Sequence, residues 1–224
     1  MLAILLVLMR PEAPHAHVSG QTSGMTAAGP PWVYGKTDAR FTIVEYADLE
    51  CPYCRAYFPV LKQWIDAHPE VNWQWHQLPL SMHEPAAMQD ARLAECAGEA
   101  GGMPAFWQTV AWIYQHTGGN GQGLPIGAHP PDITPRVKAC LDSSRPDAVI
   151  QAQAQAAARE GIDATPTLQL LDHQNGRTLT LRGTAEGDAL LSALDWLAGM
   201  PKASTPPAHT SAQPAGTSSH GMLR

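Results

Sequence analysis

The feature that most constrains the fold of this chain is the tetrapeptide Cys51-Pro52-Tyr53-Cys54, because it lies where one sequence pattern changes into another. Residues 41–48 are rich in β-branched and aromatic side chains, which predicts a buried strand. Residues 55–68 place apolar side chains at helical spacing. We therefore expect Cys51 to lie where a strand passes into a helix.

This position predicts a reactive thiol. The unpaired backbone N–H groups at a helix N-terminus favour an anion, so they lower the pKa of the Cys51 thiol and make it a nucleophile. Pro52 suits the first helical turn, where a missing N–H is tolerated. Cys54 is one turn further on, close enough to form a disulfide with Cys51. The chemistry indicated is thiol–disulfide exchange.

Two other interpretations of the cysteine pair are half of a zinc site and two unrelated buried thiols. A zinc site needs four ligands, but no His lies two to five residues from Cys96 or Cys140. His209 and His220 also lack the spacing of metal ligands. We expect no metal, and no bound cofactor is needed because the cysteine pair itself carries the electrons.

Length and charge limit the domain organisation and the possible binding partners. The 224 residues suggest one domain with an insertion, and 14 basic against 20 acidic residues argue against a nucleic-acid surface. Four cysteines are compatible with two disulfides.

Both ends of the chain are predicted to lie outside the folded domain. Residues 2–9 are apolar but too few to span a bilayer, and they resemble the core of a signal peptide. No basic residue precedes this run and Arg10 follows it, so a short anchor is an alternative. We expect an exported protein, periplasmic or otherwise extracytoplasmic. Residues 11–31 read as a flexible linker, and residues 201–224 as a disordered tail.

The elements in between follow a recognisable order. A short edge strand at 32–34 precedes the strand and redox helix, and alternating residues from 71 to 79 predict the next strand. Residues 84–160 are helical, with a break at Gly101-Gly102, and Asn175-Gly176 predicts a hairpin before a last helix at 188–200. A CxxC on such a βαβ-type unit is typical of thioredoxin-like proteins.

Several segments carry a more specific resemblance. They are residues 42–54, Leu78-Pro79-Leu80, residues 94–97 with Phe106-Trp107, and residues 161–167. Over residues 32–199 the chain resembles the DsbA family, α/β proteins with a thioredoxin-like fold and an inserted α-helical domain. The resemblance implies these parts: 1–31 signal-like segment and linker, 32–83 and 161–200 thioredoxin fold, 84–160 inserted helical domain, and 201–224 tail.

The resemblance also implies a substrate-binding surface. In the family the proline that matches Pro166 is cis and packs against the disulfide, which exposes the backbone of Thr165 to pair with a substrate chain. Thr165, Pro166, Pro52 and Tyr53 are therefore the expected substrate-binding residues.

Glu45, Glu50 and His83 are three further candidates for a role beside the cysteines. Glu45 matches a buried acid that shuttles protons for Cys51 and Cys54 in the family, with an outward-facing edge position as the alternative. Family analogues place acids like Glu50 near the site, but we expect Glu50 to be simply solvated. His83 is expected to be a surface or capping residue rather than part of the site.

The other two cysteines are expected to pair. Cys96 and Cys140 both fall on predicted helices of the insertion, and an exported protein meets an oxidising environment, so we predict a structural disulfide. The alternative is two buried free thiols.

We predict that the protein introduces disulfides into cysteine-bearing client proteins and is reoxidised by a membrane redox partner, as the resemblance implies. The alternatives are a reductase or isomerase of the same fold, and a non-catalytic peptide-binding module. DsbA itself has His where this chain has Tyr53, and Thr165 is more typical of isomerases. We expect a monomer, because the residues before the first strand are too few to form a dimerisation domain.

Overall fold

The computed structural model describes residues 30–201, so the predictions for the signal-like segment and for most of the tail lie outside the described residues. A five-stranded sheet forms the centre, with the strand order β1-β3-β2-β4-β5. Its strands are β1 (Trp32–Tyr34), β2 (Phe41–Ala47), β3 (Val71–Gln77), β4 (Thr167–Asp172) and β5 (Arg177–Arg182). These are the strands that the sequence pattern predicts.

The central strand is β2, which runs parallel to β3 and antiparallel to β4. All seven of its residues are buried, as expected for a strand covered on both faces. The hairpin β4–β5 turns at Asn175-Gly176, where Gly176 adopts a φ of 70°. The predicted hairpin is therefore present, and β1 lies at the opposite edge of the sheet.

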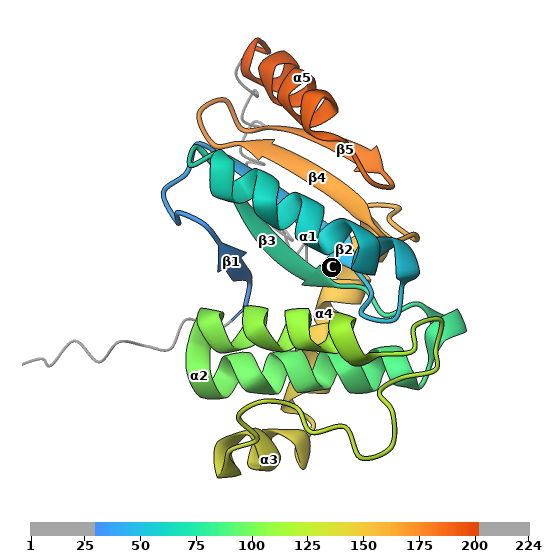
Figure 1. Ribbon diagram of the computed structural model, residues 1–224. Coiled ribbons are helices and arrows are strands. Elements are labelled where there is room, and N and C mark those ends of the chain that lie inside the picture. The colour runs from blue at the N-terminus through green and yellow to red at the C-terminus, as the bar shows by residue number, and fades with distance from the viewer. Residues whose placement is uncertain (1–29, 202–224) are drawn as a thin grey trace, which may run out of the picture.

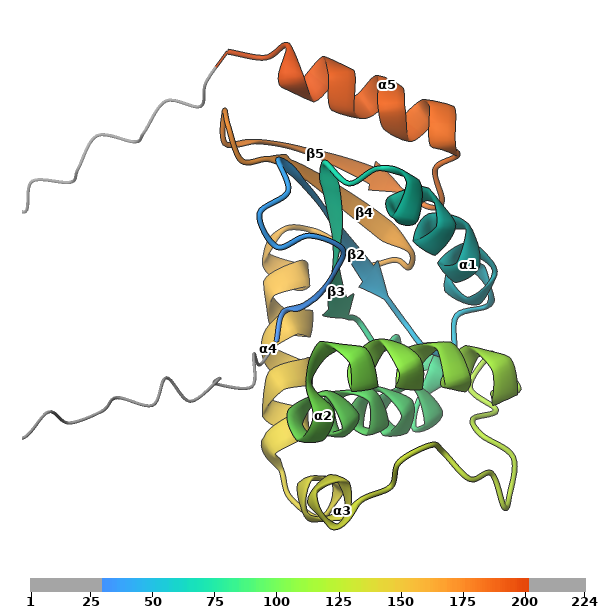
Figure 2. The same ribbon diagram turned by 60° about the vertical axis from the view of Figure 1, so that its left-hand side comes forward.

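Helices cover the two faces of this sheet (Figures 1 and 2). Helices α1 and α5 pack on one face, and α4 packs on the other. The segment between β3 and β4 is helical and holds the 3₁₀ turn η1 with α2, α3 and α4. The helices are α1 (Pro52–Ala67), η1 (Ser81–His83), α2 (Ala86–His116), α3 (Pro135–Leu141), α4 (Arg145–Arg159) and α5 (Gly187–Ala198).

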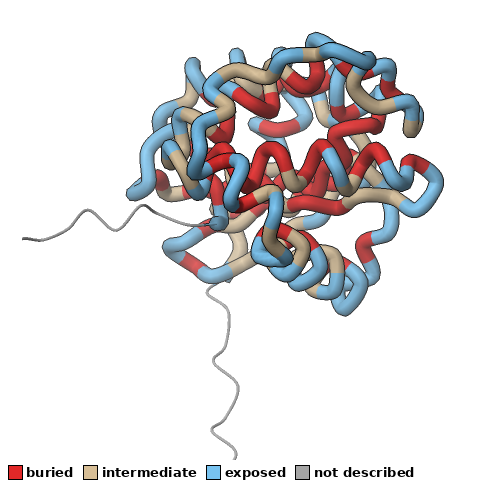
Figure 3. Tube along the Cα trace, turned by 90° about the horizontal axis from the view of Figure 1, so that it is seen from below, coloured by how far each residue is buried: buried red, intermediate tan, exposed pale blue. Residues whose placement is uncertain are grey.

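The pleat of β2 determines which of its side chains face helix α1. Successive side chains of a strand point to opposite faces. Ile43 and Ala47 pack in the core under α1, whereas Val44 and Tyr46 pack in the smaller core under α4. Glu45 shares the face of Ile43 and Ala47, and it is 1% exposed. Figure 3 shows the buried residues gathered in the interior of the trace, with the exposed residues around its outside.

Helix α2 is a pair of antiparallel arms rather than one straight rod (Figure 1). Its backbone leaves the helical conformation at Gly102, where φ is 75°, a value that glycine adopts without strain. This is the break predicted at Gly101-Gly102. The fold-back brings the second arm against the sheet, where Phe106 stacks on Trp32 and Trp107 packs against Trp73 and Trp75.

A disulfide joins α2 to α3. Cys96 and Cys140 are bonded, with their Cα atoms 5.5 Å apart, and both are buried. Val137 completes the small cluster around them. The bridge therefore holds α3 against the first arm of α2. Within residues 30–201, no helix is both long enough and apolar enough to cross a membrane.

Candidate active site

The two free cysteines lie at the start of α1, directly after the central strand. Cys51 is the N-cap residue of the helix, and Pro52 occupies its first turn. The N–H of Cys51 donates a 3.1 Å hydrogen bond to the carbonyl oxygen of Asp48, which closes the turn between β2 and α1. Cys51 therefore lies at the junction of strand and helix that the sequence predicts, with the free N–H groups of the first turn directed towards its sulfur.

The environment separates the two thiols by their acidity. A hydrogen bond from the Cys54 side chain, aided by the backbone N–H groups of Cys54 and Tyr53, lowers the pKa of Cys51 to about 6. Burial raises the pKa of Cys54 well above its ordinary value. At neutral pH the pair therefore holds one thiolate, on Cys51, and one thiol, on Cys54.

The loop before β4 meets Cys51 from the other side. The Cys51 sulfur lies 3.4 Å from the carbonyl oxygen of Thr165, and the peptide bond between Thr165 and Pro166 is cis. The Thr165 hydroxyl is buried and has no partner that meets hydrogen-bond geometry. It is nevertheless close enough to the Cys51 sulfur to help lower the thiol pKa. Thr165 thus offers a carbonyl to the thiol and a hydroxyl to the thiolate.

The two cysteines are themselves buried, at 3% exposed for Cys51 and 0% for Cys54. Tyr53, between them in the motif, is 70% exposed. Pro52 is also exposed, whereas Pro166 is buried.

Glu45 lies beneath the cysteines with its carboxyl group fully enclosed. Neither carboxyl oxygen has a partner with hydrogen-bond geometry. Burial raises the Glu45 pKa to about 8, and the nearby Trp73 indole offsets part of that effect. The charge on Glu45 in turn helps to raise the pKa of Cys54. An unpaired carboxyl group in this position is protonated near neutral pH and can exchange its proton there.

The expectation that Glu50 is solvated is wrong, because its side chain is 0% exposed. Its carboxylate accepts hydrogen bonds from the hydroxyl of Thr117 and, at 2.9 Å, from the N–H of Gly123. Its carbonyl accepts from the N–H of Asn120 at 2.8 Å. The loop after α2 therefore folds over Glu50 and removes it from solvent.

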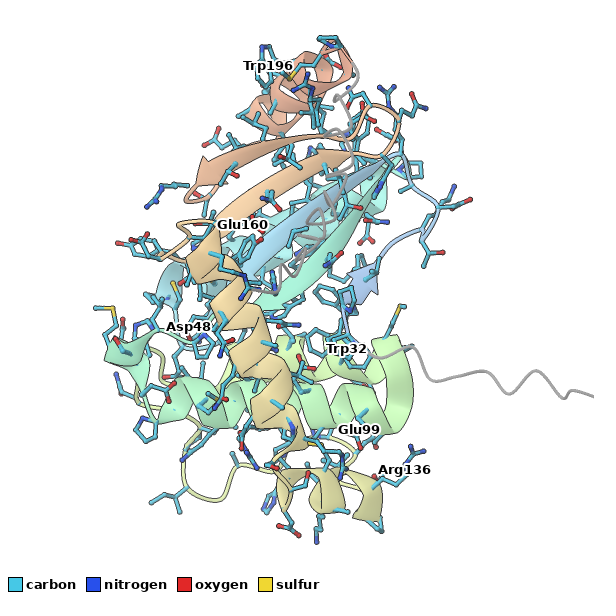
Figure 4. The ribbon with its side chains drawn as sticks, turned by 180° about the vertical axis from the view of Figure 1, so that it is seen from behind. Trp32, Asp48, Glu99, Arg136, Glu160 and Trp196 are labelled. Atoms are coloured by element: carbon cyan, nitrogen blue, oxygen red, sulfur yellow. A yellow bond between two sulfur atoms is a disulfide. The ribbon has the colours of Figure 1, made fainter. Side chains whose placement is uncertain are left out.

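The expectation that His83 is a surface or capping residue is also wrong. Its ring is buried, and Nδ1 lies 2.7 Å from Oδ2 of Asp48. Asp48 lies at the end of the sheet that faces α2 (Figure 4). Its carboxylate also accepts from the N–H groups of Glu50 and Leu80, each at 2.8 Å. His83 thus contacts the turn that carries Cys51 through Asp48.

Sequence reasoning did not single out Asp48, Asp90 or Tyr114. Asp48 was visible as an acid three positions before Cys51. Asp90 is 3% exposed on the first arm of α2, and its helical spacing from the buried Ala86 and Ala94 was the available signal. Tyr114, on the second arm, donates a 3.3 Å hydrogen bond to the Asp48 carbonyl. Among residues 30–201, no group of three or more His, Cys, Asp or Glu side chains is arranged to hold a metal ion.

A five-stranded sheet with two cysteines at the start of its redox helix, beside a cis proline, defines a thioredoxin-fold dithiol protein. Comparison with known proteins agrees with this class, since residues 27–185 match the family model described as Thioredoxin. The chain is 48% identical to DsbA2 of Pseudomonas aeruginosa, over 75% of this chain and 93% of that chain, with a TM-score of 0.71. The chain therefore belongs to the DsbA family of thioredoxin-fold thiol–disulfide oxidoreductases.

More distant structures share the fold. The thiol–disulfide exchange protein α-DsbA2 of Wolbachia pipientis is 15% identical, with a TM-score of 0.58 over 74% of this chain and 86% of that one. A part of the chain also resembles a different kind of protein, the Na(+)/H(+) antiporter NhaA 3 of Salinispora tropica, at 41% identity over 84 residues. That match covers 38% of this chain and only 12% of the antiporter.

Proposed function

We propose that this protein oxidises pairs of cysteines in client proteins outside the cytoplasm, through Cys51 and Cys54. The observation that carries the proposal is the difference between the two thiols, one with its pKa lowered to about 6 and the other with its pKa raised. Such a pair has one sulfur suited to leave or attack as a thiolate and one suited to be protonated.

The reaction begins with the Cys51–Cys54 disulfide. A client thiolate attacks the Cys51 sulfur, the sulfur–sulfur bond breaks, and Cys54 leaves with the electron pair and takes up a proton. A second client thiolate then attacks the client sulfur of the mixed disulfide and displaces the Cys51 thiolate. The client loses two electrons and two protons, and the enzyme ends as thiolate and thiol, one proton having passed to solvent.

Glu45 is the proposed proton donor and acceptor for Cys54. Its carboxyl group has a pKa of about 8, so both protonation states are accessible near neutral pH. Protonated Glu45 supplies a proton to Cys54 as it leaves. The ionised form takes that proton back when Cys54 attacks in the reverse direction.

Clients are proposed to bind over Pro52, Tyr53 and Thr165, beside the buried Cys51 sulfur. The Thr165 backbone before Pro166 offers main-chain hydrogen bonds to an extended client segment. Tyr53 and Pro52 supply exposed apolar area beside it.

The proposed direction of catalysis, oxidation of clients, rests on the Cys51 thiolate. A hydrogen-bonded Cys51 thiolate stabilises the reduced enzyme relative to its disulfide, which makes the disulfide more oxidising. The competing proposal, a reductase or isomerase, rests on Tyr53, which has no ring nitrogen to stabilise the thiolate as His would. A membrane redox partner is proposed to restore the disulfide, and the enzyme is proposed to act as an exported monomer.

The decisive experiment is a pair of assays on the purified protein, with its reduction potential measured against glutathione. We expect the oxidised protein to introduce disulfides into a reduced model client faster than the reduced protein rearranges a scrambled one, and to elute as a monomer. A potential close to that of thioredoxin, about −270 mV, would instead support the reductase. The Cys51→Ser variant is the control and is expected to be inactive in both assays.

A further inference from the structure

A cluster of buried acids lies beside the redox turn, the four residues Asp48–Cys51 between β2 and α1. Asp48, Glu50 and Asp90 are 1%, 0% and 3% exposed. Asp48 and Glu50 belong to the turn itself, and Asp90 belongs to the first arm of α2. Three buried carboxylates are costly unless cations or hydrogen-bond donors compensate for their charges.

A basic side chain contacts only one of the three carboxyl groups. Within residues 30–201, the single basic group paired with the cluster is His83, which contacts Asp48. No Lys or Arg of this part of the chain forms an ion pair with Glu50 or Asp90. Arg55 of α1 is directed to the carbonyl of Thr117 instead. Tyr114 also faces the cluster, but its hydroxyl donates to a backbone oxygen.

The carboxyl groups of Glu50 and Asp90 differ in their hydrogen-bond partners. The Glu50 carboxylate accepts from Thr117 and from Gly123, so its negative charge is stabilised by donors. Oδ2 of Asp90 is buried and has no hydrogen-bond partner. Asp90 lines the same cleft as Gly123, whose N–H donates to Glu50, and the Glu50 carboxyl group helps to raise the Asp90 pKa. A proton on Asp90 satisfies this arrangement, because its O–H then donates to the Glu50 carboxylate.

We propose that Glu50 and Asp90 share one proton and act as a positioning pair that holds the turn carrying Cys51. The proton makes Asp90 a donor, Asp90 fixes the Glu50 carboxylate, and Glu50 directly precedes the nucleophile. The loop 117–123 completes the arrangement, because it holds Glu50 from the other side through Thr117, Asn120 and Gly123. The effect on catalysis rests on the exchange chemistry proposed above, whereas the shared proton does not.

The shared proton is held only below a defined pH. Burial, with the neighbouring carboxyl groups of Glu50 and Asp48, raises the pKa of Asp90 to about 8. Above this pH Asp90 loses its proton, and its repulsion by the Glu50 carboxyl group loosens the turn. A cleft of about 360 Å³ lined by Asp90 and Gly123 lies beside the pair.

The first test detects the proton without using the redox reaction. Protein labelled with ¹³C at the aspartate carboxyl carbons is titrated by NMR, with Asp90→Asn used to assign the signal. We expect one aspartate carbon, absent from the variant, to titrate above neutral pH. If the Asp90 carbon has already titrated below neutral pH, the shared proton is refuted, whatever the enzyme's activity.

The second test separates a positioning role from a merely structural one. Asp90→Asn keeps an N–H donor to Glu50 at every pH, whereas Asp90→Ala has none. At pH 7 we expect Asp90→Asn to exchange disulfides within about twofold of the wild-type rate, and Asp90→Ala to be roughly tenfold slower, a loss equivalent to one hydrogen bond to a charged group. Asp195→Asn, at an exposed position on α5, is the matched control and is expected to match the wild type.

The pH dependence of the exchange rate tests the positioning role even if Asp90→Ala fails to fold. The rate of the wild type relative to Asp90→Asn is expected to fall as the pH rises through about 8, the pKa of Asp90. An identical profile for both proteins, or equal rates for the Asn and Ala variants, would overturn the positioning role. If the wild type itself does not exchange disulfides, the proposed function fails, and the NMR titration still tests the shared proton.

Discussion

Nδ1 of His83 lies 2.7 Å from Oδ2 of Asp48, which joins the start of the helical segment to the turn that carries Cys51. The same carboxylate accepts from the N–H groups of Glu50 and Leu80. Three donors from two segments therefore converge on one buried acid. The active-site turn is held by the helical segment as well as by the thioredoxin fold.

Asp48→Ala should destabilise the protein strongly, because it leaves these three donors without an acceptor. We expect the free energy of unfolding to fall by about 3–5 kcal/mol, measured by urea denaturation, as for other broken buried pairs. His83→Ala removes one donor and should have a smaller effect. A denaturation midpoint of Asp48→Ala equal to that of the wild type would contradict this account.

Cys51 should react with alkylating agents before Cys54 in the reduced protein. The rate of Cys51 alkylation should rise with a midpoint near pH 6, because the thiolate is the reactive form and the pKa of Cys51 is about 6. In Cys51→Ser, Cys54 should stay unreactive until the solution is strongly alkaline. Mass spectrometry that finds Cys54 modified first at neutral pH would disprove this order.

Thr165→Val should raise the pKa of Cys51, since it removes the hydroxyl that helps to stabilise the thiolate. We expect a shift of about one unit, because a hydrogen bond to a charged group contributes roughly 1.5 kcal/mol. The measurement is the pH dependence of alkylation. Thr165→Ser keeps the hydroxyl and should titrate like the wild type, so equal shifts in both variants would exclude this role of the hydroxyl.

Glu45→Gln should slow disulfide exchange at neutral pH without unfolding the protein, because the variant cannot pass a proton to Cys54. It should also change how stability depends on pH. The pKa of Glu45 is about 8 in the folded protein against 4.5 in the unfolded chain, so its contribution is full below 4.5 and is lost as the pH rises to about 8.

The stability of the wild type relative to Glu45→Gln should therefore fall between pH 4.5 and pH 8, by roughly 3–5 kcal/mol in all. Urea denaturation across this range measures the difference. Glu70→Gln, which changes an exposed glutamate, should run parallel to the wild type. Parallel curves for Glu45→Gln would show that Glu45 is ionised in the fold, and an unchanged exchange rate with an unchanged thiol titration would remove it from the mechanism.

Replacing Cys96 and Cys140 together by Ala should destabilise the fold without abolishing thiol–disulfide exchange. The bridge spans 44 positions, and closing such a loop contributes up to about 4 kcal/mol on the chain-entropy model. Thermal unfolding of the double variant measures the loss. Peptide mapping under non-reducing conditions should find the two cysteines linked, and finding both free in exported protein would reject the pairing.

Much of the fold is predictable from the sequence because its signals are local. The apolar run of β2, the helical spacing after Cys54 and the Asn175-Gly176 turn each depend on a few neighbouring residues. The junction of strand and helix then places Cys51 at a helix N-terminus. The CxxC pair and the loop around Pro166 can also be recognised from their own residues.

The burial of the acidic residues could not be predicted in this way. Whether Glu50, Asp90 and His83 are buried depends on the helical segment folding back over the redox turn, through contacts between residues far apart in the chain. Glu50 is covered by Gly123, 73 positions further on. The dithiol and its helix follow from local propensity, and so they are visible in the sequence. Which carboxyl groups lose solvent and keep their protons depends on the packing of the whole fold, because burial arises only when distant segments come together.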